Sequence, residues 1–337
     1  MGPEDDRQRV VRFWQQRAAR FGFASGAAVQ AEPVHVSDRT RVFLVRDGDL
    51  VAAVRWSRGS LLAVDKAALE AARLFVLAAE LGLAPRVLLW EQGALLLDRQ
   101  PVVASDFITP GVPDVEWFHS NLQQVAALLA RLHRDEDLGD LLESFQRGDR
   151  RADALAAARA AWANVQVRLA DLGVAAWGPE LRAVLDELTL YGAWFGSQIQ
   201  RRLAAFQGVP VGPVHGDLNR YNWLVGGDNR VTLIDWERAR LDDPALDVGM
   251  MLFWYVPRAL WPIFARGYAG ASPQAVDADA LLERARIRYP LHAIDVCAWK
   301  LERLAGGQES DSGAALAFLE PFLRDLRQLR AGTFGAG

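Results

Sequence analysis

Residues 215–224 read HGDLNRYNWL, and residues 231–236 read VTLIDW. In the first segment Asp217 and Asn222 stand five positions apart, and in the second Asp235 follows a short apolar run. A short apolar run bounded by polar residues is typical of a buried strand. The pattern therefore predicts two polar turns beside short strands, with side chains that can converge on one ligand.

The three polar residues of these turns are the types that phosphoryl transfer requires. That reaction needs an acidic residue to orient the attacking hydroxyl and oxygen ligands to hold Mg²⁺ against the phosphates. We interpret Asp217 as the residue that positions the acceptor hydroxyl and accepts its proton. Asn222 and Asp235 offer the hard oxygen atoms that Mg²⁺ prefers. The alternative is a polar turn between two core strands, without a ligand.

The order His-x-Asp-x4-Asn, followed by an Asp that ends a strand, resembles the aminoglycoside phosphotransferase and choline kinase family. The members of this family are relatives of the protein kinases that phosphorylate small molecules. The resemblance rests on His215, Asp217, Asn222 and Asp235. It implies an α+β, two-lobed, protein-kinase-like fold with a small antiparallel-sheet N-lobe and a large, mostly helical C-lobe. It also implies ATP and Mg²⁺ as cofactors, and a structural role for His215 in bracing the loop.

A further acidic residue, Asp247, lies in the segment DDPALDVG. It resembles the Asp that anchors the catalytic loop of this family from the following helix. The alternative is a carboxylate that interacts favourably with the dipole of its own helix N-terminus.

In the N-terminal part, the segment VAAVRW places Arg55 where a kinase strand presents the Lys that binds the α and β phosphates. Arginine can also bind phosphate, in a bidentate manner. We expect Glu70, on the following helix, to be the partner of Arg55. The alternative for Glu70 is an i,i+4 ion pair with Lys66 on the same helix.

Two further segments are expected to contact the nucleotide. The turn before the segment VFLV has no Gly-x-Gly-x-x-Gly and instead reads SDRTR, as in the polar turns of small-molecule kinases. The segment LLLDRQP resembles the linker between lobes in this family, where backbone groups read the adenine. The residues predicted from these segments are Ser37, Arg39 and Thr40 for the phosphates, and Leu97, Asp98 and Arg99 for the base.

The order of the expected elements agrees with this fold. Apolar residues recur at helical spacing in the first segment, and an Asp-Gly turn between two Val- and Leu-rich runs indicates a β-hairpin. We therefore expect an N-lobe over residues 1–100, with its boundary near residues 98–101, and a C-lobe over residues 101–337. The expected N-lobe elements are a helix over 5–21, a hairpin within 28–56, a helix over 65–81, and strands at 86–90 and 94–97. The expected C-lobe helices cover residues 114–133, 153–172, 180–203, 244–268, 277–304 and 314–329.

The composition is that of an ordinary globular protein. The 337 residues are 51% apolar and 24% charged, with a net charge of −4. A chain without a basic excess is not expected to bind nucleic acid. Charged residues interrupt the N-terminal segment and the most apolar segments, so we expect neither a signal peptide nor a membrane span, and we predict a cytoplasmic protein. The single Cys297 excludes an intrachain disulfide.

The acceptor is indicated only in outline. The chain has 12 Trp, and the region after Asp235 is rich in aromatic residues. Aromatic rings near acidic groups bind ammonium ions through cation–π attraction. A choline-, thiamine- or aminoglycoside-like acceptor is therefore conceivable, although aromatics at helical spacing also form cores. The residues considered for this pocket are Glu237, Trp254, Tyr255 and Trp299.

The leading hypothesis is an ATP- and Mg²⁺-dependent kinase that phosphorylates a hydroxyl of a small molecule. A catalytically silent binding or regulatory protein is the alternative from another class, but the set Asp217, Asn222 and Asp235 disfavours it. A protein kinase is disfavoured because the Gly-rich loop is missing and because Asn219 replaces the catalytic-loop Lys.

Overall fold

The computed structural model describes residues 3–18, 29–36, 40–57, 65–94, 97, 100–108, 113–173, 175, 177–227, 229–308 and 310–331. The chain forms two compact units, each built from segments that are distant in the sequence. Unit 1 comprises Met1–Asp114, Glu136–Phe145 and Asn219–Ala239, and unit 2 comprises Val115–Asp135, Gln146–Leu218 and Arg240–Gly337. The expected lobe boundary near residues 98–101 stays a prediction.

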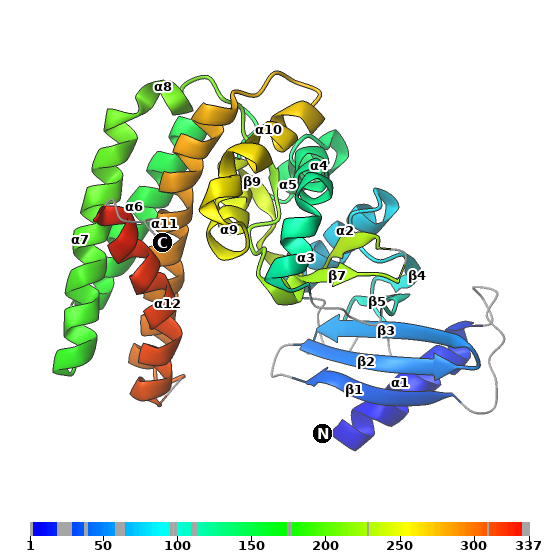
Figure 1. Ribbon diagram of the computed structural model, residues 1–337. Coiled ribbons are helices and arrows are strands. Elements are labelled where there is room, and N and C mark those ends of the chain that lie inside the picture. Colours follow the sequence, from blue (N-terminus) through cyan, green and yellow to red (C-terminus); the bar gives the residue numbers. More distant parts are fainter. Residues whose placement is uncertain are drawn as a thin grey trace. The chain divides into compact units, whose positions relative to one another are not determined.

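Unit 1 contains an antiparallel sheet with the strand order β1-β2-β3-β5-β4 (Figure 1). Its strands are β1 (Gln30–Val36), β2 (Thr40–Asp47), β3 (Leu50–Ser57), β4 (Val87–Glu91) and β5 (Val102–Asp106). The expected hairpin is confirmed, because Asp47 pairs with Leu50 and Gly48 adopts a positive φ of 61° in the turn. Helix α1 (Pro3–Ala18) packs against β1 and β2 and buries Phe13 and Trp14.

Ala94 and Leu97, the described residues of the strand expected over residues 94–97, lie outside any strand, and the fifth strand is β5 instead. Ala94, Leu97 and Gln100 are joined by turn hydrogen bonds, Leu97 N–H to Ala94 O at 2.9 Å and Gln100 N–H to Leu97 O at 3.1 Å. Ala94 and Leu97 are apolar because they fill the core of unit 1 from this turn. Pro101 directly precedes β5, a position at which a strand tolerates proline.

The rest of unit 1 includes the predicted metal ligands and a helix, α2, that packs against β4, β5, α5 and η3. Helix α2 (Lys66–Glu80) begins at Asp65, whose side chain accepts hydrogen bonds from the N–H groups of Ala67 and Ala68. Such N-caps satisfy backbone donors that the helix itself leaves unpaired. The remaining elements are α5 (Glu136–Ser144), the 3₁₀ turns η2 (Arg220–Asn222) and η3 (Trp236–Arg238), and the hairpin of β7 (Trp223–Val225) and β8 (Val231–Leu233).

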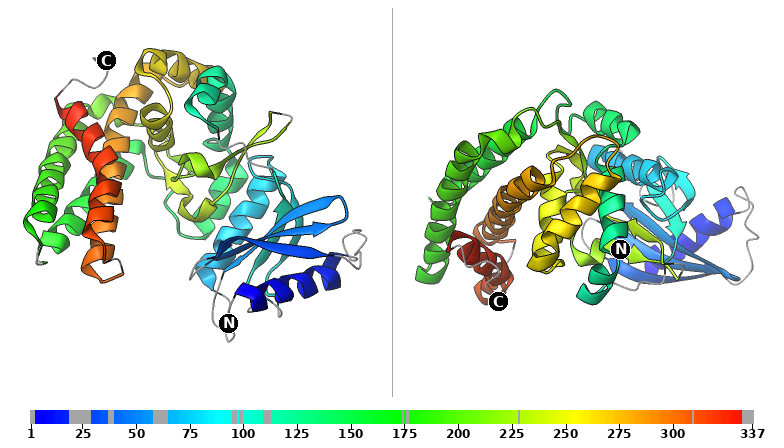
Figure 2. Two further views of the ribbon diagram at one scale, coloured as in Figure 1. Left: turned by 60° about the horizontal axis from the view of Figure 1, so that its bottom comes forward. Right: turned by 45° about the horizontal axis from the view of Figure 1, so that its top comes forward.

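Unit 2 is mostly helical. In Figures 1 and 2 its four longest helices, α6, α7, α11 and α12, pack side by side. Strand β6 (Gly212–Val214) pairs antiparallel with β9 (Arg240–Asp242), and the loop of Asp217 follows β6 directly. The elements are α3 (Val115–Ser120), α4 (Leu122–Leu132), α6 (Ala154–Gly173), α7 (Pro179–Arg201), α8 (Leu203–Phe206), β6 (Gly212–Val214), β9 (Arg240–Asp242), α9 (Ala245–Trp254), η4 (Arg258–Leu260), α10 (Trp261–Ala271), α11 (Ala278–Ala305) and α12 (Ser312–Arg330).

Two of the expected helices are divided in the structure. The helix expected over residues 114–133 changes direction at Asn121, between α3 and α4. The helix expected over residues 244–268 ends at Trp254 and resumes at Trp261, because Pro257 cannot continue the helix of the residues before it. Among the described residues, no helix has both the length and the hydropathy that a membrane span requires.

Candidate active site

The two predicted metal ligands flank one end of the β7–β8 hairpin in unit 1. Trp223 pairs with Leu233 in this hairpin, so Asn222 directly precedes the paired region and Asp235 follows it by two residues. The Ile234 N–H donates to the Asn222 carbonyl at 3.0 Å, which extends the ladder by one pair. Because paired strands bring opposite residues together, Asn222 lies opposite Ile234, and Asp235 follows Ile234 directly at this end. Asn222 is buried and Asp235 is half-buried.

Asp235 has a left-handed backbone conformation, with φ 67° and ψ 61°. Non-glycine residues adopt this conformation infrequently, and such residues gather at functional sites. The conformation turns the chain sharply from β8 into η3. The next residue, Trp236, is buried, and its indole N–H donates to the Leu233 carbonyl at 3.1 Å. The turn that presents Asp235 is therefore held by a packed aromatic side chain.

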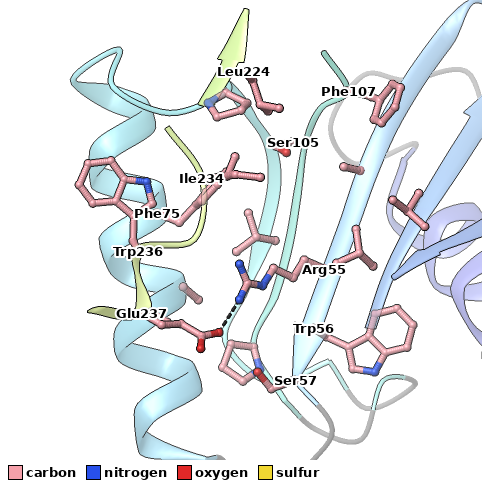
Figure 3. Close-up of a pocket in the computed structure, with 18 of the residues that line it drawn as sticks. Arg55, Trp56, Ser57, Phe75, Ser105, Phe107, Leu224, Ile234, Trp236 and Glu237 are labelled. Carbon is pink, nitrogen blue, oxygen red and sulfur yellow. Dashed lines mark hydrogen bonds and ion pairs between the residues drawn. The ribbon is translucent and has the colours of Figure 1, made fainter. Parts of the chain in front are cut away.

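Arg55 extends from β3 toward this turn. Its guanidinium lies 3.5 Å from Asp235 Oδ1 and donates a hydrogen bond to Glu237 Oε1, the contact drawn as a dashed line in Figure 3. The Glu70 carboxylate instead lies 3.7 Å from Lys66 Nζ. The structure thus pairs Arg55 differently from the sequence-based expectation and shows the Lys66–Glu70 pair that was its alternative. Glu70 is nevertheless buried rather than solvated.

A cavity of about 310 Å³ lies in unit 1 beside Arg55 and Glu237. This volume falls within the range of about 300–1,000 Å³ that is usual for small-ligand sites. Its wall is mainly apolar, and Figure 3 shows residues of the sheet, of α2 and of the β7–β8 hairpin around it. The lining residues include Val42, Ala53, Ala72, Phe75, Val103, Ser105, Phe107, Ile108, Leu224, Ile234 and Trp236.

The predicted nucleotide contacts are only partly described by the structure. Ser37, Arg39, Asp98 and Arg99 lie outside the described residues. Thr40 is the first residue of β2 and pairs with Ser57, while the Leu97 side chain is fully buried in the core. The cavity is instead lined by Phe107 and Ile108 directly after β5, which the sequence reading missed. The apolar run VVASDFI after Pro101 is the sequence signal for these residues, but the lobe boundary expected near residues 98–101 places it in the C-lobe.

The loop of Asp217 belongs to unit 2 and is fixed by Asp247. The His215 N–H donates to Asp247 Oδ2 at 2.7 Å, and the Gly216 N–H donates to Asp247 Oδ1 at 2.9 Å. Gly216 has a φ of 75°, which glycine adopts without steric cost. His215, Gly216 and Asp247 are all buried, whereas Asp217 is half-buried. The structure thus brings together His215 and Asp247, the two residues predicted to support the loop.

Asp247 has a further partner, His133, at the end of α4. His133 Nε2 lies 3.1 Å from Asp247 Oδ2, and His133 Nδ1 lies 2.8 Å from the Tyr268 hydroxyl. Burial alone raises the pKa of Asp247, but the His133 hydrogen bond, the nearby histidines and the Gly216 N–H lower it to a net value below the ordinary one. The sequence alone indicates no role for His133, because the segment ALLARLH is recognisable only as the end of a helix.

The residue after Asp217 is held from two sides. The Leu218 N–H lies 3.5 Å from Met250 Sδ, and the Leu218 carbonyl accepts a hydrogen bond from the Tyr255 hydroxyl at 3.2 Å. The Tyr255 ring stacks on Phe118, with 4.4 Å between the ring centroids. Tyr255 is therefore a packed residue that contacts the backbone beside Asp217.

The other residues considered for the acceptor pocket have different surroundings. Trp254 is half-buried, and its indole N–H donates to the Tyr289 hydroxyl at 2.8 Å. Trp299 is also half-buried, with the Arg303 guanidinium 5.3 Å from its ring. Glu237, in unit 1, contacts Arg55. A role of these residues in acceptor binding stays a prediction.

The chain matches one protein-family model and is similar to several solved structures. The model of the phosphotransferase enzyme family matches residues 32–287. Among solved structures, the choline kinase from Cryptosporidium parvum Iowa II has a TM-score of 0.64 at 12% identity, covering 98% of this chain and 97% of that one. The Plasmodium vivax ethanolamine kinase has a TM-score of 0.60 at 15% identity, covering 88% and 82%. The macrolide 2'-phosphotransferase from Brachybacterium faecium has a TM-score of 0.58 at 19% identity, covering 92% and 97%.

At these identities the structural likenesses show the fold, which is the kinase-like fold expected from the sequence. The family match extends over most of the chain and includes His215, Asp217, Asn222 and Asp235. The chain therefore belongs to the phosphotransferase enzyme family and is a small-molecule kinase.

Proposed function

We propose that the protein transfers the γ-phosphate of ATP, in a Mg²⁺-dependent reaction, to a hydroxyl group of a small polar or cationic molecule. The observation that carries this proposal is the β7–β8 hairpin, which holds Asn222 and Asp235 together at one end, next to the cavity that Arg55 lines. An amide oxygen, a carboxylate and a guanidinium form a set suited to a metal-bound triphosphate.

Asn222 and Asp235 fit a magnesium ion because both offer hard oxygen atoms and Mg²⁺ is usually held by one or two carboxylates together with substrate phosphates. When bound, the ion would neutralise negative charge on the phosphates. The left-handed backbone conformation of Asp235 sets the direction in which its side chain leaves the chain, and the buried Trp236 holds that turn in place. These residues thus form a preorganised ligand pair.

Asp217 is the proposed catalytic residue. Its carboxylate would accept a hydrogen bond from the acceptor hydroxyl and then its proton. Asp247 holds the backbone N–H groups of His215 and Gly216, which precede Asp217. Tyr255 holds the backbone carbonyl of Leu218, which follows it. A side chain on a fixed backbone is needed because errors of about 1 Å in the position of reacting groups can cost about 10²-fold in rate.

Arg55 is the proposed phosphate-binding residue. The guanidinium now interacts with two carboxylates, Asp235 and Glu237. Phosphate oxygens would compete with Glu237 for the same N–H groups, while Asp235 would turn to the metal. The apolar cavity between the sheet and α2 is the proposed site of the nucleotide base, with Phe107 and Ile108 at its wall.

The acceptor class is proposed from two sources. The similar structures include a choline kinase, an ethanolamine kinase and a macrolide 2'-phosphotransferase. In this chain, half-buried Trp254 and Trp299 offer aromatic surface of the kind that attracts ammonium groups. We therefore place choline-, thiamine- and aminoglycoside-like molecules first among the candidates.

Purified protein incubated with ATP, Mg²⁺ and a panel of amino alcohols, aminoglycosides, sugars and vitamins tests this function. ADP release that depends on one acceptor class and is lost in Asp235→Ala would support it. Nucleotide binding without acceptor-dependent turnover across the panel would instead favour a silent binding protein of the same fold.

The role of Arg55 has its own test. The variant Arg55→Ala should bind ATP·Mg²⁺ about 10- to 100-fold more weakly, because a hydrogen bond to a charged group contributes about 1.5–3 kcal/mol and 1.4 kcal/mol is tenfold in affinity. Titration calorimetry measures the change, and a smaller thermal shift with nucleotide should accompany it.

Arg17→Ala is the matched control for this variant. Arg17 is also a partly exposed arginine of unit 1 paired with a carboxylate, Glu91, but it does not line the cavity. Its removal should leave nucleotide affinity unchanged. Equal affinities of Arg55→Ala and Arg17→Ala would remove Arg55 from the phosphate site.

A further inference from the structure

A line of buried side chains in unit 2 leads from α10 to the loop of Asp217. The Tyr268 hydroxyl contacts His133 Nδ1, His133 Nε2 contacts Asp247 Oδ2, and Asp247 accepts the N–H groups of His215 and Gly216. Tyr268, His133 and Asp247 are each at most 1% exposed. Water therefore does not compete for these hydrogen bonds, and each group depends on the next.

The chemistry of the groups fixes the direction of the hydrogen bonds. Burial raises the pKa of Asp247, but its hydrogen bonds with His133 and the Gly216 N–H lower it to a net value below the ordinary one, so its carboxylate is an acceptor only. His133 Nε2 must then carry a hydrogen and donate it. In a neutral imidazole the other nitrogen, Nδ1, is an acceptor, and it receives the Tyr268 O–H.

The Tyr268 hydroxyl is suited to this donor role. Burial raises the pKa of this hydroxyl, so it keeps its proton. Among the described residues, the Tyr268 hydroxyl forms its hydrogen bond with His133. If Nδ1 carried the hydrogen instead, the Tyr268 proton would have no acceptor there and the Asp247 carboxylate would face a lone pair. A buried polar group left without a partner costs about 1–3 kcal/mol.

We propose that His133 is a positioning residue of the phosphotransferase reaction: it holds the carboxylate that fixes the Asp217 loop, and Tyr268 selects the tautomer that lets it do so. The inference rests on the proposed catalytic role of Asp217. Neither His133 nor Tyr268 touches a reacting group in this scheme. Each acts through Asp247 on the backbone at residues 215 and 216.

Two substitutions of His133 separate its two nitrogens. In His133→Gln the amide nitrogen is as many bonds from Cβ as Nε2, so it can still donate to Asp247. In His133→Asn the polar atoms reach only the position of Nδ1, on the side of Tyr268. With the acceptor found in the panel, we expect His133→Gln to keep kcat within about threefold of the parent protein, and His133→Asn to lose about 10²-fold, the loss that a misplaced reacting group produces. Nucleotide affinity should stay the same in both, because the cavity and its lining belong to unit 1.

Tyr268→Phe is a milder variant that removes one hydroxyl and keeps the ring. We expect kcat to fall less in this variant than in His133→Asn, and we expect the variant to contain a mixture of the two His133 tautomers. The tautomer is read from the ¹⁵N signals of the imidazole in protein labelled at its five histidines, with His133→Gln giving the assignment. The parent protein should show the form protonated at Nε2.

A readout without turnover keeps this inference separate from the proposed function. Amide hydrogen exchange at His215 and Gly216 should be faster in His133→Asn than in His133→Gln, whether or not an acceptor is known. If the parent protein phosphorylates nothing in the panel, the proposed function fails while this exchange difference still tests the positioning role. Equal exchange and equal kcat in the two variants, or a His133 protonated at Nδ1, would overturn the inference.

Discussion

Asp217→Asn is expected to lower kcat about 10²- to 10⁴-fold, the contribution usual for a general acid or base, while nucleotide affinity stays unchanged. The amide keeps the size of the side chain but cannot accept the proton of the acceptor hydroxyl. The loop should keep its conformation, because the bonds that fix it run from the backbone of His215 and Gly216 to Asp247 and do not involve the substituted side chain. Steady-state kinetics with the acceptor found in the panel measures kcat, and calorimetry measures nucleotide affinity.

Asp171→Asn is the matched control, since it makes the same chemical change at an exposed position on α6 of the same unit. It should have the parent kcat. Retention of more than about a third of the parent activity in Asp217→Asn would show that another group accepts the proton, since even the lower limit of this contribution is about 10².

The candidate site residues that the sequence predicts are separated by short stretches of chain. Asp217 and Asn222 share one segment, and the hairpin that brings Asp235 to Asn222 spans only β7 and β8. A short separation makes such residues predictable from the sequence, because a short connecting segment can adopt few conformations. The Asp47-Gly48 turn could be predicted for the same reason.

His133 and the pairing of Arg55 with Glu237 are not predicted from the sequence, because they depend on contacts between distant segments. His133 meets Asp247 and Tyr268 across separations of 114 and 135 residues, and Arg55 meets Glu237 across 182 residues. No local pattern indicates such partners. Likewise, the sequence cannot distinguish Leu97 from a strand residue, because a buried position in a turn and one in a strand both favour an apolar side chain.

The largest expected loss of stability comes from Arg288→Met in unit 2. Arg288 is 1% exposed, and its guanidinium forms an ion pair with Asp242, which is buried as well. Removing one partner of a buried ion pair leaves a buried charge poorly compensated and costs about 3–5 kcal/mol. Arg240, which is half-exposed, still contacts Asp242 in the variant, so we expect a value near 3 kcal/mol, the lower end of that range. Urea denaturation monitored by circular dichroism measures the change.

The loss should depend on pH in a defined direction. Burial alone raises the pKa of Asp242, but Arg288 and Arg240 outweigh it and hold the pKa below its ordinary value. The ionised carboxylate therefore contributes stability above the pKa of the unfolded chain, about 3.9, and this contribution is lost as the pH falls through the folded value. Without Arg288 the folded pKa rises. The difference between variant and parent should thus be largest near pH 7 and should shrink as the pH falls below about 4.

Two further variants distinguish a lost charge partner from lost packing. Arg288→Met combined with Asp242→Leu removes both charges, and replacing a buried ion pair by apolar side chains is often neutral, so the double variant should recover most of the loss. Arg168→Met is the matched control, because Arg168 on α6 pairs with Asp295 and Glu302 on α11, but all three side chains are partly exposed. Exposed pairs contribute about 0–1 kcal/mol, so this control should cost less than about 1 kcal/mol. If Arg288→Met lowers the free energy of unfolding no more than Arg168→Met does, groups other than Arg288 stabilise the Asp242 charge. The double variant should then be less stable than Arg288→Met alone.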